Sequence, residues 1–184
     1  MRYMYAVVGI IVAAFLAIIL IVTRPSGTKT TVKPAMKLPD YATRDSSVSI
    51  TTEGRLVGQD KFRSIRITVD ANERTIEILS GYEKSVERSE TFSNTQQAYD
   101  TFLRALNNAG FMKTKTASYP DERGVCPLGY RYLYDLKDDN KSALHTWSAN
   151  CGNIGSFAGA GTTVRQLFQA QISSYNTFTS GVLQ

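Results

Sequence analysis

The longest apolar run of the chain extends from residue 5 to residue 22 and contains no charged side chain. A helix rises about 1.5 Å per residue, so a run of this length crosses a hydrocarbon core of roughly 30 Å. Arg2 and Arg24 flank the run. The pattern predicts a single-pass transmembrane signal-anchor over residues 1–23, with residues 5–22 in the lipid bilayer.

Cleaved leaders are the alternatives to this anchor. A signal peptide has a short apolar region followed by small residues at the cleavage site. Here the apolar run is long and leads into the residues IVTRP at 21–25, which are a poor cleavage site. A pilin-type leader would carry an early acidic residue, and a lipoprotein would have a cysteine directly after the run; neither is present. The sequence favours an uncleaved anchor.

Residues 24–46 lack any helical or strand periodicity. Pro25, Pro34 and Pro39 interrupt this segment, together with Gly27 and several serine and threonine residues. Such a composition is typical of an extended spacer. We expect a linker here.

Alternating patterns begin at residue 47. Residues 47–52 alternate Val48 and Ile50 with polar residues, which predicts a half-buried strand. Residues 64–70 and 73–80 alternate in the same way, which predicts a hairpin with its turn at Ala71-Asn72. This register places isoleucines on one face and polar residues on the other: Ile65 with Ile78, Ile67 with Ile76, Arg66 with Glu77, and Thr68 with Thr75.

A charged strand and a helix are expected next. Residues 83–91 alternate charges, as is typical of a protected edge strand. Ser93 and Gln96 form a capping-box pattern that predicts the start of a helix, and Gly110 predicts its end. Its apolar face is Tyr99, Phe102, Leu103 and Leu106.

A second hairpin is predicted after the polar loop 112–125. With Asp138-Asp139 as its turn, Cys126 faces Cys151, which predicts a disulfide bond. Such a bond stabilises the fold by about 3 kcal/mol. Together with a membrane anchor, paired cysteines indicate an oxidising compartment. The alternative is two reduced, buried cysteines in a cytoplasmic domain.

The same register gathers aromatic side chains on one face of the hairpin, which is our candidate interaction face: Tyr130, Tyr132, Tyr134, His145 and Trp147. Leu133, Leu136 and Leu144 favour the opposite face. If the aromatic residues are exposed, they form a platform for a sugar ring or a protein partner. If they are buried, Trp147 packs near the disulfide and the face is part of the core.

Residues 150–161 are rich in glycine, and residues 163–173 are expected to form a helix capped by Thr162. A glycine-rich segment before a helix resembles a phosphate-binding loop, but no lysine follows it as in a P-loop. A flexible connection is the favoured interpretation. Residues 179–184 show no pattern and are expected to be a disordered tail.

These elements predict an α+β fold, with an antiparallel sheet of five to six strands and two helices packed on one face. We assign the extracytoplasmic domain to residues 47–178. The net charge of +5 divides into +4 for residues 1–46 and +1 for the remainder. The surplus therefore belongs to the membrane flank, and nucleic acid is discounted as a partner.

The side of the membrane is the least direct inference. Basic residues after the anchor outnumber those before it, and on this basis alone the domain would be cytoplasmic. Long domains translocate largely regardless of flanking charge, and the cysteines look paired. We therefore expect the domain to be extracytoplasmic at the cell membrane.

No motif in the sequence identifies a reaction. His145 is the single histidine, so no metal site with several histidines and no Ser-His-acid arrangement is predicted. We expect no cofactor and no catalysis. The leading hypothesis is a non-catalytic domain that binds an envelope protein or a glycan. Alternatives are an inhibitor or regulator of an extracytoplasmic protease acting through loop 112–125 or 152–161, and an enzyme that uses the glycine-rich loop.

Several segments carry a resemblance that covers most of residues 50–175: GRLVGQDKFRSIRITVD, RTIEIL, YDLKD, HTWSANCG and TVRQLFQAQI. In these segments the chain resembles single-span envelope proteins of Saccharibacteria-like ultrasmall bacteria. The resemblance implies a bacterial surface location and assigns no activity. The order of elements also resembles that of emfourin-type protease inhibitors, in topology alone.

Overall fold

The computed structural model describes residues 36–183. Residues 36–184 form one compact unit of the chain. The transmembrane prediction for residues 5–22 lies outside the described residues. Within residues 36–183, no helix has both the length and the apolar character that a membrane span requires.

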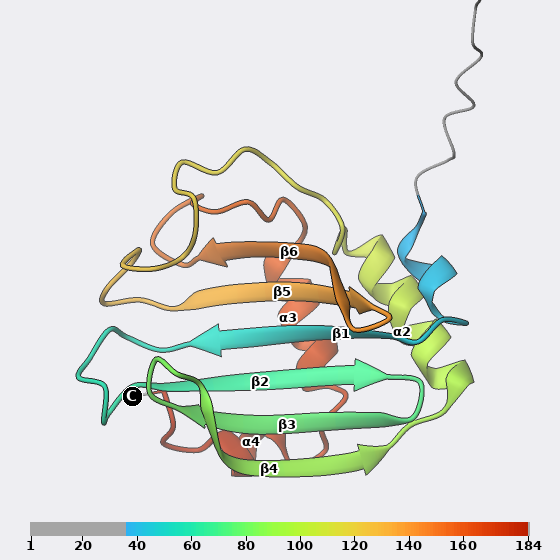
Figure 1. Ribbon diagram of the computed structural model, residues 1–184, viewed down its shortest axis with the longest axis horizontal. Coiled ribbons are helices and arrows are strands. Elements are labelled where there is room, and N and C mark those ends of the chain that lie inside the picture. Colours follow the sequence, from blue (N-terminus) through green and yellow to red (C-terminus); the bar gives the residue numbers. More distant parts are fainter. Residues whose placement is uncertain (1–35, 184) are drawn as a thin grey trace, which may run out of the picture. The chain divides into compact units, whose positions relative to one another are not determined.

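Six antiparallel strands form one open sheet in the order β4-β3-β2-β1-β5-β6. Strands β1 to β4 follow one another as a meander, and the β5-β6 hairpin joins the other side of β1 (Figure 1). The bounds of the strands are β1 Ser46–Glu53, β2 Arg63–Asp70, β3 Glu73–Ser80, β4 Ser85–Ser93, β5 Arg131–Asp138 and β6 Lys141–Ala149.

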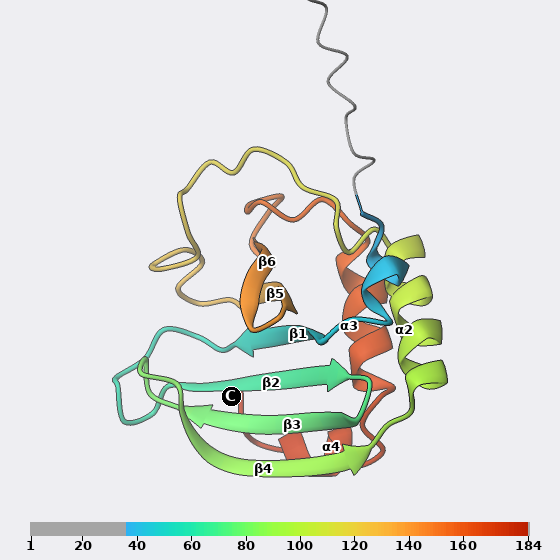
Figure 2. The same ribbon diagram turned by 45° about the vertical axis from the view of Figure 1, so that its right-hand side comes forward.

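The helices lie on one face of the sheet (Figures 1 and 2). We call the opposite face the uncovered face, because none of the described helices packs on it. They are α2 Gln96–Asn108, α3 Gly161–Gln169 and the short α4 Tyr175–Thr179, preceded by a 3-10 helix, η1, at Leu38–Tyr41. The predicted α+β architecture is confirmed, with α4 as an addition to the two expected helices.

The main core lies between the sheet and the helices, as the alternating pattern of the strands requires. Strands contribute residues such as Val48, Ile50, Ile65, Ile67, Ile76 and Ile78, and α2 contributes Tyr99, Phe102, Leu103 and Leu106. Phe168 of α3 packs edge-on against Phe102, with ring centroids 5.1 Å apart. The predicted apolar face of α2 is therefore correct.

The β2-β3 hairpin has the predicted register. Ile65 pairs with Ile78 and Ile67 with Ile76, while Arg66 pairs with Glu77 on the opposite face. The charged segment predicted to be an edge strand is β4, which lies at the edge of the sheet and is mostly exposed. Its charges discourage pairing with other chains.

The start of α2 differs from the prediction. Ser93 is the last residue of β4, where it pairs with Glu73, so it does not cap the helix. Thr95 is the N-cap instead, and its side-chain oxygen accepts a hydrogen bond from the Ala98 amide at 3.2 Å. The predicted glycine cap is present: Gly110 has a φ of +77°, and the Phe111 amide donates to the Leu106 carbonyl, as in a Schellman motif.

Three predicted boundaries also shift. The linker expected to reach residue 46 ends earlier, because Leu38 of η1 is fully buried in the core. Helix α3 begins at Gly161 after Ala160, so Thr162 is not its cap. The chain end is more regular than expected, since Phe178 of α4 is buried and Leu183 packs against the core.

Candidate functional site

The predicted aromatic face is not formed, because the predicted register of the β5-β6 hairpin is wrong. Tyr132 pairs with Ser148 and not with His145, an offset of three positions along β6. An odd offset moves side chains to opposite faces of the sheet. Tyr132 and Tyr134 therefore lie on the helix side, whereas Trp147 lies on the other side, where it pairs with Leu133.

The residues of that candidate face are also mostly covered. Tyr134 and Trp147 have exposed fractions of 0% and 2%, and the hydroxyl of Tyr130 donates to the Leu183 carbonyl at 3.2 Å. Only His145 is exposed. The alternative in which the aromatic residues belong to the core is the one that the structure supports, and the exposed platform is absent.

Cys126 and Cys151 form a disulfide bond, with their sulfur atoms 2.26 Å apart. The pairing is as predicted, although the two residues lie beyond the ends of β5 and β6 rather than opposite each other in the ladder. Cys126, Trp147 and Leu133 form a small second core on the uncovered side of the sheet. Trp147 thus packs near the disulfide.

The glycine-rich segment covers the outer edge of β6. Gly155 bridges to Ser148, and the Phe157 amide donates to the Trp147 carbonyl at 2.9 Å. A Cβ atom at Gly155 would lie 2.2 Å from the Trp147 carbonyl oxygen. Glycine is therefore needed there for close backbone approach, and this observation accounts for the segment without a phosphate ligand.

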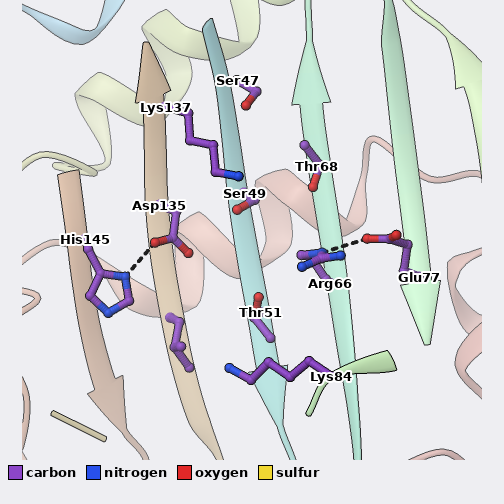
Figure 3. A pocket seen from close by; sticks show the side chains of 11 residues that line it. Ser47, Ser49, Thr51, Arg66, Thr68, Glu77, Lys84, Asp135, Lys137 and His145 are labelled. Atoms are coloured by element: carbon purple, nitrogen blue, oxygen red, sulfur yellow. Dashed lines mark hydrogen bonds and ion pairs between the residues drawn. The ribbon is translucent and has the colours of Figure 1, made fainter. Parts of the chain in front are cut away.

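The uncovered face of the sheet carries a polar hollow of about 400 Å³ (Figure 3). Its floor is β1, from which Ser47, Ser49 and Thr51 point outward at alternate positions. Thr68 and Arg66 on β2 flank these residues on one side, and β5 flanks them on the other. The alternation of β1 and β2 in the sequence already indicated a polar face here.

An ion pair borders the hollow on one side, and a hydrogen-bonded histidine and aspartate border it on the other. Arg66 Nε lies 2.6 Å from Glu77 Oε2, and His145 Nδ1 lies 2.5 Å from Asp135 Oδ1. The hydrogen bond to Asp135 is the largest influence on His145 and raises the pKa of its imidazole above the ordinary value of 6.5. Lys137 is exposed, and no ion pair to it is present among the described residues.

A buried charge cluster lies at the end of the hollow. Arg131 is 1% exposed and pairs with Glu53 at 3.0 Å. Lys84 also pairs with Glu53, at 2.8 Å. Arg131 additionally donates to the carbonyls of Gly54 and Cys126, so one guanidinium joins β1 to the disulfide-bonded segment.

Four segments meet beyond this cluster, at the end of the sheet opposite α2 (Figure 1). We call this region the loop end; it comprises residues 54–62, 81–84, 121–130 and 150–153. Leu128 projects from it with an exposed fraction of 83%, and Val57 and Tyr82 in two of the other segments are also exposed. The sequence did not predict this exposure, because hydrophobicity alone does not distinguish a buried leucine from an exposed one.

Three hydrogen bonds and the disulfide restrain the backbone of the turn that carries Leu128. The Gly129 amide donates to the Cys126 carbonyl at 3.0 Å, and the Leu56 amide donates to the Pro127 carbonyl at 2.8 Å. The Tyr130 amide donates to the side chain of Asn150 at 2.8 Å. With the disulfide, these bonds fix the position of Leu128.

The described residues contain no group of three or more His, Cys, Asp or Glu side chains that could hold a metal ion. His145 and Asp135 resemble part of a catalytic triad, but Ser49 lies on the strand beyond Asp135 and not beside the outer nitrogen of His145. No hydrogen bond to that nitrogen is present in the described part of the chain.

Comparison with known proteins adds no assignment: no protein-family model matches the chain, and no curated protein matches it. The resemblance to Saccharibacteria-like envelope proteins therefore stays a prediction.

Proposed function

We propose that the chain is a single-pass, signal-anchored protein of a bacterial cell envelope, and that its extracytoplasmic domain binds a protein partner without catalysis. The observation that carries this proposal is Leu128, a large apolar side chain that is 83% exposed on a firmly held turn. Exposed apolar side chains that gather at one place mark sites of protein association.

The rigidity of the turn supports binding. A turn whose backbone is already fixed loses little conformational entropy on association, so more of the burial energy of Leu128 contributes to affinity. The disulfide and the three hydrogen bonds around Leu128 provide this fixation. Leu128 then acts as an apolar anchor that enters a pocket on the partner.

A protein is favoured over the other partners. The glycan hypothesis relied on exposed aromatic rings, and Tyr134 and Trp147 are buried. An anionic lipid surface would favour an excess of basic residues. The loop end is balanced, with four basic and four acidic side chains: Arg55, Lys61, Lys84 and Arg123 against Asp60, Glu83, Asp121 and Glu122.

The location in the envelope rests on the sequence and on the disulfide. The apolar run at residues 5–22 and its basic flank indicate an anchor, and a disulfide bond persists in oxidising compartments. A maleimide that does not cross membranes should label Cys126 and Cys151 on intact cells only after a reductant is added. Labelling that needs cell lysis but no reductant would contradict the location.

Photo-crosslinking tests the protein partner. A benzophenone amino acid replaces Val57 in the full chain on cells that make it, and covalent adducts are identified by mass. Val57 follows Leu56, whose amide donates to the carbonyl of Pro127, the residue before Leu128. We expect an adduct with one protein that is lost with Leu128→Asp. Val86→Asp is the matched control, because Val86 is also exposed but lies on β4, at the opposite edge of the sheet from the β5-β6 hairpin.

Once the partner is identified, its affinity for the Leu128→Ala variant can be measured. The substitution should weaken binding by roughly 10- to 100-fold, because about three side-chain carbon atoms are no longer buried in the interface. Adducts that persist in the Leu128→Asp variant, or an affinity unchanged by Leu128→Ala, would contradict the proposal.

A further inference from the structure

The hydroxyl groups of the hollow have no partner within the described part of the chain. Ser47, Ser49, Thr51 and Thr68 line the hollow, and none of their side chains takes part in a hydrogen bond with another described residue. On the helix side of the same strand, Ser46 donates to the Tyr41 carbonyl at 2.7 Å. The unused hydroxyls are therefore a property of the uncovered face and not of the strand.

Thr51 is the least exposed of these residues, at 5% for the residue as a whole. Its hydroxyl is not among the buried side-chain atoms of the described residues that lack a partner, because Thr51 lines the open hollow. A hydroxyl group can both donate and accept a hydrogen bond. The row of hydroxyls is therefore available to a polar group above β1.

The charges of the hollow favour an anion. Its lining residues include three cationic side chains, Arg66, Lys84 and Lys137, and two carboxylates, Glu77 and Asp135. The adjoining pair of Glu53 and Arg131 is neutral. One positive charge remains in excess, and protonation of His145 adds a second.

The two lysines of the hollow flank β1 from opposite sides. Lys137 on β5 and Lys84, which follows β3, both extend toward β1 (Figure 3). Lys84 has a φ of +56°, in the left-handed region that residues other than glycine seldom adopt. Its ammonium nitrogen lies 2.8 Å from a Glu53 carboxylate oxygen, and its side chain lines the hollow.

We propose that this hollow binds an extended polypeptide segment that carries acidic side chains at alternate positions. Such side chains lie on one side of an extended chain, about 6.6–6.8 Å apart. The outward hydroxyls of β1 repeat with the same two-residue spacing. Carboxylates at this spacing would meet Ser47, Ser49 and Thr51 in turn, with Lys137 and Lys84 at either side.

The shape of the hollow favours a segment over a single small anion. From Ser47 to Thr51 the floor extends by about 13 Å, since a strand rises about 3.3 Å per residue. A phosphate or a sulfate would occupy one or two of the hydroxyls and leave the others without a partner. This site is separate from the Leu128 turn, so its failure would leave the proposed function unaffected.

Three synthetic peptides test the proposal by isothermal titration calorimetry against the full chain in detergent micelles. The first alternates glutamate with threonine over seven residues, the second replaces glutamate by glutamine, and the third has the composition of the first with its glutamates in one block. We expect binding of the first peptide, at least tenfold weaker binding of the other two, and weaker binding at higher salt.

Variants locate the site. Lys137→Gln should weaken binding of the alternating peptide by roughly two- to fivefold, as expected for one exposed ion pair, and Ser49→Ala should also weaken it. Lys61→Gln is the matched control, because Lys61 is exposed outside the hollow. The proposal is overturned if the glutamine peptide binds equally well, if Lys61→Gln weakens binding as much as Lys137→Gln, or if no peptide binds at millimolar concentration.

Discussion

His145 and Asp135 illustrate how one pair of side chains can set a pH dependence. The carboxylate raises the pKa of the imidazole in the folded state above the ordinary value of 6.5. The pair therefore stabilises the fold fully below about pH 6.5, and this contribution is lost as the pH rises through the folded-state pKa. We expect the free energy of unfolding to fall as the pH rises from about 6.5 into the mildly alkaline range.

This expectation is checked with thermal unfolding of the full chain at a series of pH values. His145→Gln should remove the dependence over this range, because no other described residue has its usual pKa there and glutamine does not titrate. The imidazole is about half exposed, which keeps the effect small. A His145→Gln profile as steep as that of the native chain would contradict the assignment.

A second prediction at this scale concerns the β5-β6 turn. Asp139 and Asn140 both have left-handed backbone conformations, with φ of +51° and +57°, as a type I′ turn requires. Glycine adopts this conformation without steric cost. Asn140→Gly should raise the free energy of unfolding by about 0.5–1 kcal/mol in chemical denaturation. Asp135→Gly, inside β5, should lower it and serves as the contrast.

Arg131 should be among the least replaceable residues. Its side chain is 1% exposed and bonded to Glu53 and to three carbonyl groups. Removing one member of a buried pair leaves a buried charge, at a typical cost of about 3–5 kcal/mol. Arg131→Leu should approach the lower value, because Lys84 still pairs with Glu53. A double variant with Glu53→Gln should lose less than the sum of the single changes.

At the scale of elements, the two hairpins show which part of the fold the sequence determines. In β2 and β3 only one face is apolar, so Ile65 and Ile67 admit a single register. In β5 and β6 both faces contain buried residues, Tyr134 on the helix side and Leu133 on the other. The pattern then allows several registers, and an irregularity at Leu136 shifts the ladder further.

The candidate sites were predictable to different degrees for the same reason. Alternating polar residues on β1 already indicated a polar face, so the floor of the hollow follows from the sequence. The meeting of Lys137 with Lys84 depends on the position of β5 beside β1, a long-range pairing that local patterns do not reveal. The exposure of Leu128 depends on a turn fixed by distant contacts with Leu56 and Asn150.

The start of α2 yields a prediction that distinguishes Ser93 from Thr95, two residues further along the chain. Thr95 caps the helix, whereas Ser93 belongs to β4. Thr95→Ala should lower the free energy of unfolding by about 1 kcal/mol, since one backbone amide of the first turn loses its partner. Ser93→Ala should change it by less than about 0.5 kcal/mol. A reversed order of the two effects in chemical denaturation would place the cap at Ser93.

For the whole molecule, the decisive covalent link is the disulfide around the β5-β6 hairpin. Cys126 and Cys151 are separated by 25 positions, and closing a loop of that size stabilises the fold by about 3.5 kcal/mol in the chain-entropy estimate. The Cys126→Ala/Cys151→Ala double variant should lose about this amount in chemical denaturation. The Leu128 turn should also become more mobile. Without the disulfide, only the hydrogen bonds of Pro127 and Tyr130 restrain its backbone.

The two consequences can be measured separately. Binding of the partner through Leu128 should weaken in the double variant even under conditions where the chain is fully folded, since the turn then loses entropy on association. Binding of the alternating acidic peptide should change little, because the hydroxyls of β1 lie outside the closed loop and Lys137, although inside it, lies on β5, which stays paired with β1. If both affinities fell together at full folding, the two sites would form a single one, and the division of the domain into a loop end and a polar hollow would have to be abandoned.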